Sequence, residues 1–152
     1  MAHFVRTHPA PQVKGPPYGY SKFRQHVRQD FGRRCAYCLM DELWAGGEEN
    51  FELDHFRPKQ KFPDLLQDFH NLYWSCRVCN SNKWDHWPSA ELEQQRVGLI
   101  DFCRHDFQDH FQLSPNGLWV PLTLSAEYTK QIMKLNRPHL VELRVRVGWR
   151  PE

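Results

Sequence analysis

Apolar residues recur at every fourth position near the start of the chain. In residues 20–31 (YSKFRQHVRQDF), this spacing places Phe23, Val27 and Phe31 on one face, which predicts an amphipathic helix. A glycine follows directly and is a typical helix stop. Residues 1–19 are rich in proline and have no hydrophobic period, so they are expected to form an arm.

The middle of the chain predicts a strand, a loop, a second strand and a helix. Residues 51–56 (FELDHF) alternate as a short strand does, and residues 71–76 (NLYWSC) are rich in strand-forming side chains. The stretch between them contains two prolines and three basic residues, which is typical of a loop. Residues 77–87 (RVCNSNKWDHW) predict a helix that must end before Pro88.

The last third of the chain predicts a hairpin and two helices. Residues 114–117 (SPNG) are a turn signal between two β-rich runs. Ser125 is expected to cap a helix that carries Tyr128, Ile132 and Leu135 on one face, and Pro138 is expected to open the last helix. These apolar positions indicate core packing and no chemistry.

Length and composition are those of one ordinary globular domain of mixed α+β class. The chain has 152 residues, of which 40% are hydrophobic and 25% charged. It contains no apolar run of about 18 residues, and its first twenty residues lack the apolar centre of a secretion signal, so we expect no membrane span and a cytoplasmic location. The expected organisation is an arm at 1–19, a main domain at 20–100, and a hairpin and helical extension at 101–152 that packs on the same core.

Charge is distributed unevenly along the chain. Residues 1–34 hold seven basic side chains against one acidic, net +6, and residues 127–152 hold six against three, net +3. Residues 35–126 hold seven against fourteen, net −7. Basic ends around an acidic middle suit a polyanion held against a site that gathers cations. Ordinary solvated surface charge gives the same pattern, so charge alone decides nothing.

Four of the five cysteines form two CxxC pairs, Cys35/Cys38 and Cys76/Cys79. In a reducing compartment such pairs favour metal over disulfides, and four thiolates suit one tetrahedral Zn²⁺. The alternatives are two unrelated thiol pairs or a redox CxxC, although no thioredoxin-like βαβ pattern surrounds either pair. We expect Cys103 to be a packing residue.

Side chains suited to phosphodiester hydrolysis lie between and just after the cysteine pairs. Asp54 and His55 end the first expected strand, Asn71 starts the second, and Asn80 and Lys83 lie on the helix. Histidine suits a general base because its pKa is near neutrality, and carboxylate and amide oxygens suit Mg²⁺ or Mn²⁺. Adjacent strand residues point to opposite faces, so the aspartate and histidine reach one phosphate only if the strand ends or bends there.

This order of motifs (CxxC, DH, N, CxxCN, K) resembles the HNH endonuclease family, whose ββα-metal fold is a two-stranded hairpin followed by a helix. The resemblance covers residues 35–87. The strings LDHFRPK and NLYWSCRVCNSNK, and the tail PLTLSAEYTKQIMKLNRP, are similar to a zinc-stabilised subgroup. Several of its members are small nucleases of bacterial anti-phage systems, paired with an ATPase. The expected fold is therefore an α+β, ββα-metal (HNH) finger, pinned by a four-cysteine zinc site and flanked by helices.

The resemblance implies a role for each matching residue. His55 would be the general base, Asp54 and Asn80 would hold a catalytic Mg²⁺ or Mn²⁺, and Asn71 would orient the imidazole. Lys83 falls where many members keep a basic residue near the phosphate. Position 80 is Asn where the family name has His, and a neutral amide favours Mg²⁺ or Mn²⁺ over a second zinc.

Three basic loop residues, Arg57, Lys59 and Lys61, are candidate phosphate contacts by position and charge, although solvated loop lysines are common. The predicted function is metal-dependent hydrolysis of DNA to 5′-phosphate and 3′-hydroxyl ends, with a separate structural zinc. A non-catalytic zinc module that binds nucleic acid or protein stays an alternative, as does an RNA-directed nuclease with the same site. The resemblance suggests anti-phage defence with a partner ATPase or another defence protein, and a homo-oligomer stays open.

Overall fold

A computed structural model describes residues 3–6 and 8–149, and these form two compact units. The first unit spans Phe4–His86, and the second begins at Trp87 and takes in His3. The division thus falls just after residue 86, whereas the sequence pattern placed its boundaries at residues 20 and 100. No helix in the described part of the chain is long and apolar enough to cross a membrane.

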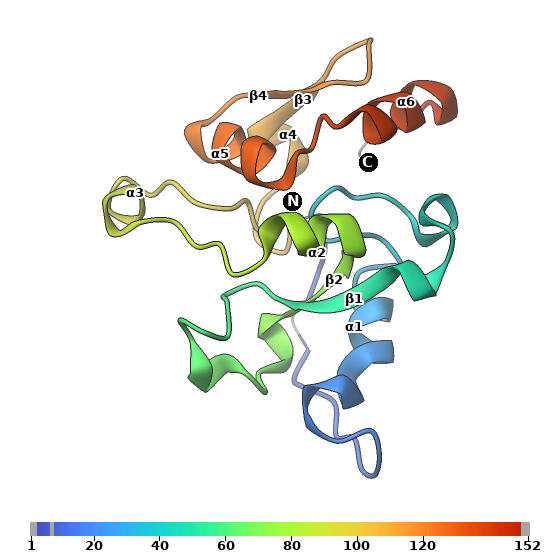
Figure 1. The fold of residues 1–152 in the computed structure, drawn as a ribbon, viewed down its shortest axis with the longest axis vertical. Coiled ribbons are helices and arrows are strands. Elements are labelled where there is room, and N and C mark those ends of the chain that lie inside the picture. Colours follow the sequence, from blue (N-terminus) through green and yellow to red (C-terminus); the bar gives the residue numbers. More distant parts are fainter. Residues whose placement is uncertain (1–2, 7, 150–152) are drawn as a thin grey trace. The chain divides into compact units, whose positions relative to one another are not determined.

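An antiparallel hairpin followed by a helix forms the centre of the first unit. Strand β1 (Phe51–His55) pairs with strand β2 (Leu72–Cys76), so that Phe51 lies opposite Cys76 and His55 opposite Leu72. Helix α2 (Arg77–Lys83) begins directly after β2 and contacts both strands (Figure 1). The expected mixed fold, with its hairpin and following helix, is confirmed.

The amphipathic helix expected before the first cysteine pair is also present. It consists of a 3₁₀ turn, η1 (Gly19–Phe23), and helix α1 (Arg24–Asp30), and its apolar residues Val27 and Phe31 are fully buried. Shorter 3₁₀ turns shape the loops of this unit: η2 (Glu42–Ala45), η3 (Glu48–Asn50), η4 (Pro63–Leu65) and η5 (Phe69–Asn71).

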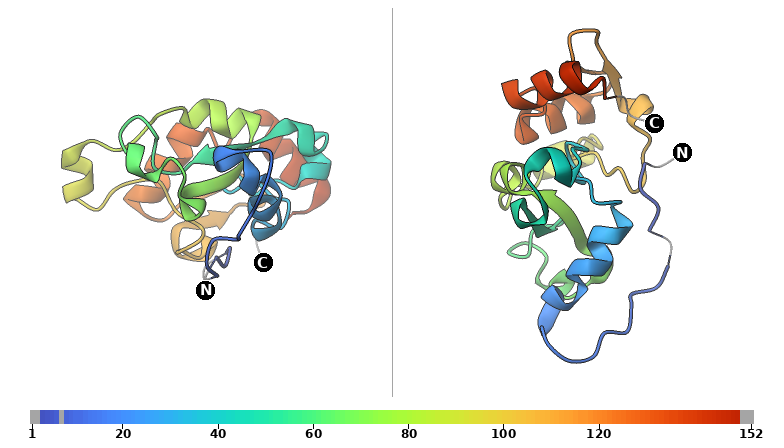
Figure 2. Two further views of the ribbon diagram at one scale, coloured as in Figure 1. Left: turned by 90° about the horizontal axis from the view of Figure 1, so that it is seen from below. Right: turned by 90° about the vertical axis from the view of Figure 1, so that its right-hand side faces the viewer.

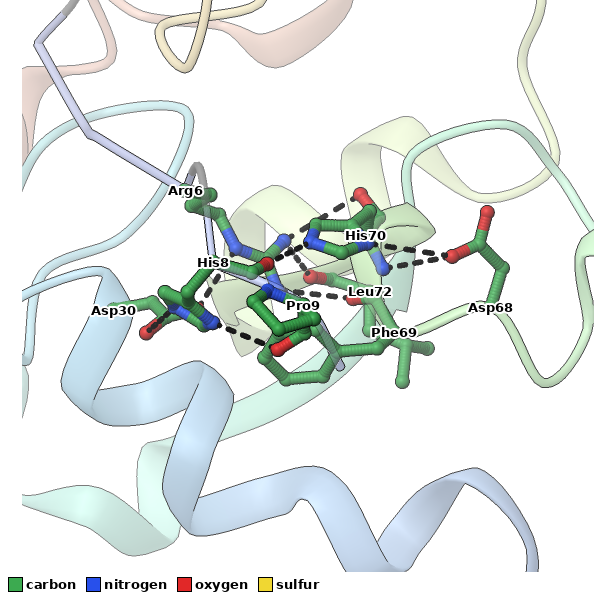
Figure 3. A network of polar contacts seen from close by, with 8 residues as sticks. All are labelled: Arg6, His8, Pro9, Asp30, Asp68, Phe69, His70 and Leu72. Atoms are coloured by element: carbon green, nitrogen blue, oxygen red, sulfur yellow. Dashed lines mark hydrogen bonds and ion pairs between the residues drawn. The ribbon is translucent and has the colours of Figure 1, made fainter. Parts of the chain in front are cut away.

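The N-terminal segment is attached to the hairpin by its first side chains. Residues 8–18 run past α1 before turning back into it (Figure 2). Arg6, whose side chain is only 4% exposed, forms a 3.0 Å ion pair with Asp30 and donates hydrogen bonds to the carbonyls of Phe69 and Leu72 (Figure 3). Phe4 is buried against the Phe31 ring.

The second unit packs short elements around an aromatic core that includes Trp119, Phe102 and Phe107. The elements are α3 (Ala90–Gln94), α4 (Phe107–His110), β3 (Phe111–Leu113), β4 (Trp119–Pro121), α5 (Leu124–Met133) and α6 (Pro138–Val147). The predicted turn joins β3 to β4, with the Gly117 N–H donating to the Ser114 carbonyl. Pro138 opens the last helix, as expected.

The start and the buried face of α5 differ from the expectation. The capping side chain is Thr123, whose hydroxyl accepts from the Ala126 N–H, whereas the Ser125 hydroxyl donates to the Arg96 carbonyl. Tyr128 and Ile132 are only half-buried, whereas Leu135, the third residue of the expected face, lies just beyond the helix and is fully buried. The buried positions of the helix are Ala126, Thr129 and Met133.

Candidate active site and metal centre

The two CxxC pairs meet in the first unit. Cys35 and Cys38 lie in the loop after α1, Cys76 ends β2, and Cys79 lies in α2; all four are buried. Their sulfur atoms lie within 4.8 Å of one another, and the Sγ atoms of Cys38 and Cys76 are 3.9 Å apart. The separation of thirty-seven residues between the pairs is thus closed by the hairpin.

This cluster fits a tetrahedral zinc ion. Zinc–sulfur bonds of about 2.3 Å place the sulfur ligands about 3.8 Å apart, close to the separation of Cys38 and Cys76. Hydrogen bonding with the other thiols, that of Cys35 first, raises the pKa of Cys79 well above its ordinary value. Crowded buried sulfurs keep their protons unless a cation replaces them. The four-cysteine cluster is a possible zinc site at the junction of β2 and α2.

Asp54 and His55 line the same cavity at the end of β1. Their exposed fractions are 6% and 7%, and the cavity has a volume of about 490 Å³. Neighbouring residues within a strand point to opposite faces. Because β1 ends at His55, both side chains can reach the cavity, as the sequence required. Asn80 of α2 lines it as well.

The imidazole of His55 is oriented by the loop that follows β1. Its Nε2 atom lies 3.0 Å from the carbonyl oxygen of Leu66, and the ring of Tyr20 packs against it edge-on at 4.7 Å. A carbonyl only accepts hydrogen bonds, so Nε2 carries the proton. In the neutral imidazole this leaves the lone pair on Nδ1, and that tautomer is the one a general base needs.

The side chain of Asn71 is hydrogen-bonded to the backbone of the loop that follows β1. Its side-chain oxygen accepts from the Arg57 N–H at 2.9 Å, and its amide donates to the Arg57 carbonyl at 3.1 Å. These bonds close the base of the loop that presents the Leu66 carbonyl to His55. The direct orienting bond from Asn71 to the ring, which the resemblance implied, is not among the described contacts and stays a prediction.

Asp54 belongs to a buried group of polar side chains. The hydroxyl of Tyr37 donates to one carboxylate oxygen, and the ammonium of Lys83 lies 3.1 Å from it. Lys83 also donates to the His55 carbonyl at 2.7 Å. Burial raises the pKa of Asp54, and the positive charge of Lys83 opposes that rise. Burial, reinforced by Asp54, raises the pKa of Tyr37 well above its ordinary value, so the phenol keeps its proton.

Lys83 is completely buried, which differs from its expected place beside the substrate phosphate. Residues three apart on a helix share a face, so Lys83 and Asn80 both point toward β1. There the Lys83 ammonium forms an ion pair with Asp54, and it is buried.

Glu52 is a cavity residue that the motif analysis missed. It lies two residues before Asp54 on the same face of β1, and it accepts a 2.6 Å hydrogen bond from the Asn80 amide. Arg77 forms a 3.5 Å ion pair with it, and both residues line the cavity. Residues two apart in a strand share a face, so the position of Asp54 could have predicted that Glu52 faces the same side. Because the amide nitrogen of Asn80 donates to Glu52, the side-chain oxygen of Asn80 is the atom that could bind a cation.

The three basic loop residues, Arg57, Lys59 and Lys61, are exposed, and of them only Lys59 lines the cavity. The guanidinium of Arg57 lies over the ring of Phe62, 5.5 Å from its centre. The structure thus brings together Asp54, His55, Asn80 and Lys59 at the cavity, whereas Arg57 and Lys61 are not among the residues that line it.

Comparison with known proteins agrees with this geometry. Residues 35–86 match the HNH endonuclease family model. The matched range contains both CxxC pairs and all the candidate residues of the site. The chain is also 28% identical, over 100 residues, to the Septu protein PtuB of Bacillus thuringiensis. That alignment covers 60% of this chain and 36% of the relative, so the chain spans little more than a third of the relative's length.

Proposed function

We propose that this chain is a metal-dependent HNH endonuclease that hydrolyses DNA phosphodiester bonds. The observation that carries the proposal is the state of His55, held through Nε2 by the Leu66 carbonyl at a cavity with oxygen ligands from Asp54 and Asn80. In that state the imidazole accepts a proton from water through Nδ1, and the water oxygen attacks phosphorus in line. The bond to the 3′-oxygen breaks and that oxygen takes a proton from solvent water, which leaves a 5′-phosphate and a 3′-hydroxyl.

Asp54 and Asn80 offer the oxygen donors of a hard cation, and Glu52 adds a neighbouring carboxylate. Mg²⁺ or Mn²⁺ held there would neutralise charge on the scissile phosphate and the leaving oxygen. Lys59 stands at the cavity to contact the phosphate backbone, and Arg57 and Lys61 extend this positive surface. In this proposal the four-cysteine zinc holds the hairpin to the helix and takes no part in the reaction.

The proposed setting is anti-phage defence in the cytoplasm. It is supported by the resemblance to small nucleases of such systems, by the likeness to a Septu protein, and by the four clustered thiols, which suit a reducing compartment. A partner ATPase or another defence protein would then control access to DNA. Purification of the tagged chain from its own cells, before and after DNA is added, tests whether an ATPase or another partner associates with it.

Cleavage of supercoiled plasmid by zinc-loaded protein tests the reaction. We expect nicking or linearisation with Mg²⁺ or Mn²⁺, no cleavage in EDTA, and no cleavage by His55→Ala with an unchanged circular dichroism spectrum. A folded wild-type protein that cuts neither DNA nor RNA under any of these conditions would favour the non-catalytic binding module. Cleavage of RNA but not of DNA would support the same catalytic residues and would show that the substrate is RNA.

A further inference from the structure

We propose that Trp84 stacks on an unpaired nucleobase beside the active site, so that the strand to be cut is bound single-stranded or locally opened. The inference rests on the proposed nuclease function and names the form of its substrate. Trp84 directly follows the last residue of α2 and lines the same cavity as Asp54 and His55. It is 74% exposed, although an indole is one of the largest apolar surfaces a side chain offers.

The backbone at Trp84 is held in a conformation that favours glycine. Its φ of 47° and ψ of −125° lie in the region of the second residue of a type II′ turn. The His86 N–H donates to the Lys83 carbonyl at 2.8 Å, which closes that turn. Among the described contacts, no hydrogen bond or ring contact of the indole offsets the strain. A strained and mostly exposed tryptophan among the residues that line a cavity points to a bound ligand.

Two basic side chains line the cavity with Trp84. Lys59 and Arg77 are both exposed, and Arg77 is paired with Glu52, one of three acidic residues that also line it. Cations beside an aromatic platform are how proteins bind single strands without reading sequence. Trp44 provides the contrast within this unit. It is 50% exposed but does not line the cavity, and a single exposed aromatic of that kind is ordinary.

Binding of fluorescein-labelled oligonucleotides by the full chain tests the inference. The measurements use the His55→Ala background without added Mg²⁺ or Mn²⁺, so that no strand is cut. The probes are a single-stranded DNA, an RNA of the same sequence, and an equally long abasic phosphodiester chain. We expect Trp84→Ala to weaken DNA binding roughly five- to hundredfold and to leave binding of the abasic chain unchanged. Trp84→Phe keeps most of the affinity, and Trp44→Ala, the matched control, keeps all of it.

A second variant separates a ligand contact from a structural role. Trp84→Gly removes the indole and relieves the positive φ, so it should raise the melting temperature while weakening DNA binding as much as Trp84→Ala does. A structural tryptophan would lose stability in both variants. The RNA probe shows whether the platform accepts both sugars, since stacking requires only a base.

Equal affinity of Trp84→Ala and its parent for the single strand would overturn the inference, as would an equal loss on the abasic chain. Failure of the proposed function looks different. Wild-type protein that does not cut nucleic acid with added metal contradicts the nuclease, whatever Trp84 does. Wild-type protein that cuts plasmid while Trp84→Ala binds single strands normally contradicts only the stacking contact.

Discussion

A single basic residue shows how the environment decides the role of a side chain. Lys83 lies one helical turn after Asn80, where a contact to the substrate phosphate was expected. In the structure its ammonium is fully buried and lies 3.1 Å from the Asp54 carboxylate. Its role is therefore to neutralise Asp54 and to hold the end of β1 through the His55 carbonyl.

We expect Lys83→Met to lower the free energy of unfolding by about 3–5 kcal/mol at neutral pH, because it leaves the buried Asp54 carboxylate without an opposite charge. Protonation of Asp54 removes that negative charge, so the loss should shrink as the pH falls through the pKa of Asp54, which burial raises above its ordinary value. Urea unfolding at several pH values measures both effects.

The double variant Asp54→Asn/Lys83→Met is the control for this ion pair. It removes both charges and should recover much of the stability that Lys83→Met loses, because neither side chain is then an unpaired buried ion. A surface phosphate contact gives the opposite pattern. In that case Lys83→Met would unfold like the wild type and would only weaken DNA binding.

Among the elements, the hairpin was well predicted from sequence, whereas the end of α2 and the cap of α5 were not. Alternation in FELDHF, the strand-forming residues of NLYWSC and the second CxxC are local signals, and they predicted β1, β2 and the start of α2. Helix α2 ends at Lys83, a turn before the expected limit, because Trp84 takes a positive φ that its residue type does not announce. Similarly, Thr123 caps α5 in place of Ser125 because capping depends on the dihedral angles of one residue.

The burial of Lys83 and the bonds of Asn71 depend on contacts between elements. The spacing of three residues places Lys83 and Asn80 on the same face of α2. Only the folded hairpin shows that this face packs against Asp54. Likewise, the sequence made Asn71 a candidate partner of His55, while the closed loop gives it the Arg57 backbone.

The N-terminal segment depends on Arg6 for its attachment. The guanidinium lies over the rings of Phe31 and Phe69 and donates hydrogen bonds to the carbonyls of Phe69 and Leu72. Truncation of the Arg6 side chain would therefore leave these acceptors unpaired. We expect Arg6→Ala to lower the free energy of unfolding by about 2–4 kcal/mol in urea. Arg6→Lys should recover less than half, because an ammonium lacks the planar fork.

The matched control for Arg6 is Arg146→Ala, which removes an arginine from an exposed ion pair with Glu142. Its effect should stay within about 0.5 kcal/mol. If Arg6→Ala were as mild as this control, the segment would not depend on its guanidinium for attachment.

The same segment should respond to pH through His8. The hydrogen bond to the Pro9 carbonyl, followed by the bond and charge of Asp30, raises the pKa of His8 above its ordinary value (Figure 3). The stabilisation is then complete below about pH 6.5 and is lost as the pH rises through the raised pKa. We expect the melting-temperature difference between wild type and His8→Ala to be larger at pH 5.5 than at pH 8.5. A difference independent of pH would contradict the charged contact, and an NMR titration of the ring gives its pKa directly.

At the scale of the whole molecule, the candidate chemistry is confined to the unit that spans Phe4–His86. All the described residues that line the cavity, and all four clustered cysteines, belong to it. The two proposed metal sites nevertheless differ in kind. The cysteines are buried where the loop after α1 meets the junction of β2 and α2, whereas the candidate oxygen ligands Asp54 and Asn80 line the cavity. Withdrawal of each metal should therefore have a distinct effect on fold and on activity.

We expect brief EDTA treatment to stop cleavage without altering the circular dichroism spectrum, and added Mg²⁺ to restore it. Prolonged exposure to a zinc-selective chelator should instead release one zinc per chain and lower the melting temperature, because folding and thiolate coordination are coupled. Cys76→Ser should have the same structural effect, whereas His55→Ala should keep both the zinc and the fold. Zinc content measured by mass spectrometry, beside melting curves and plasmid cleavage, distinguishes these outcomes. A Cys76→Ser protein that stays folded and active would show that the cysteine cluster does not hold the hairpin to the helix.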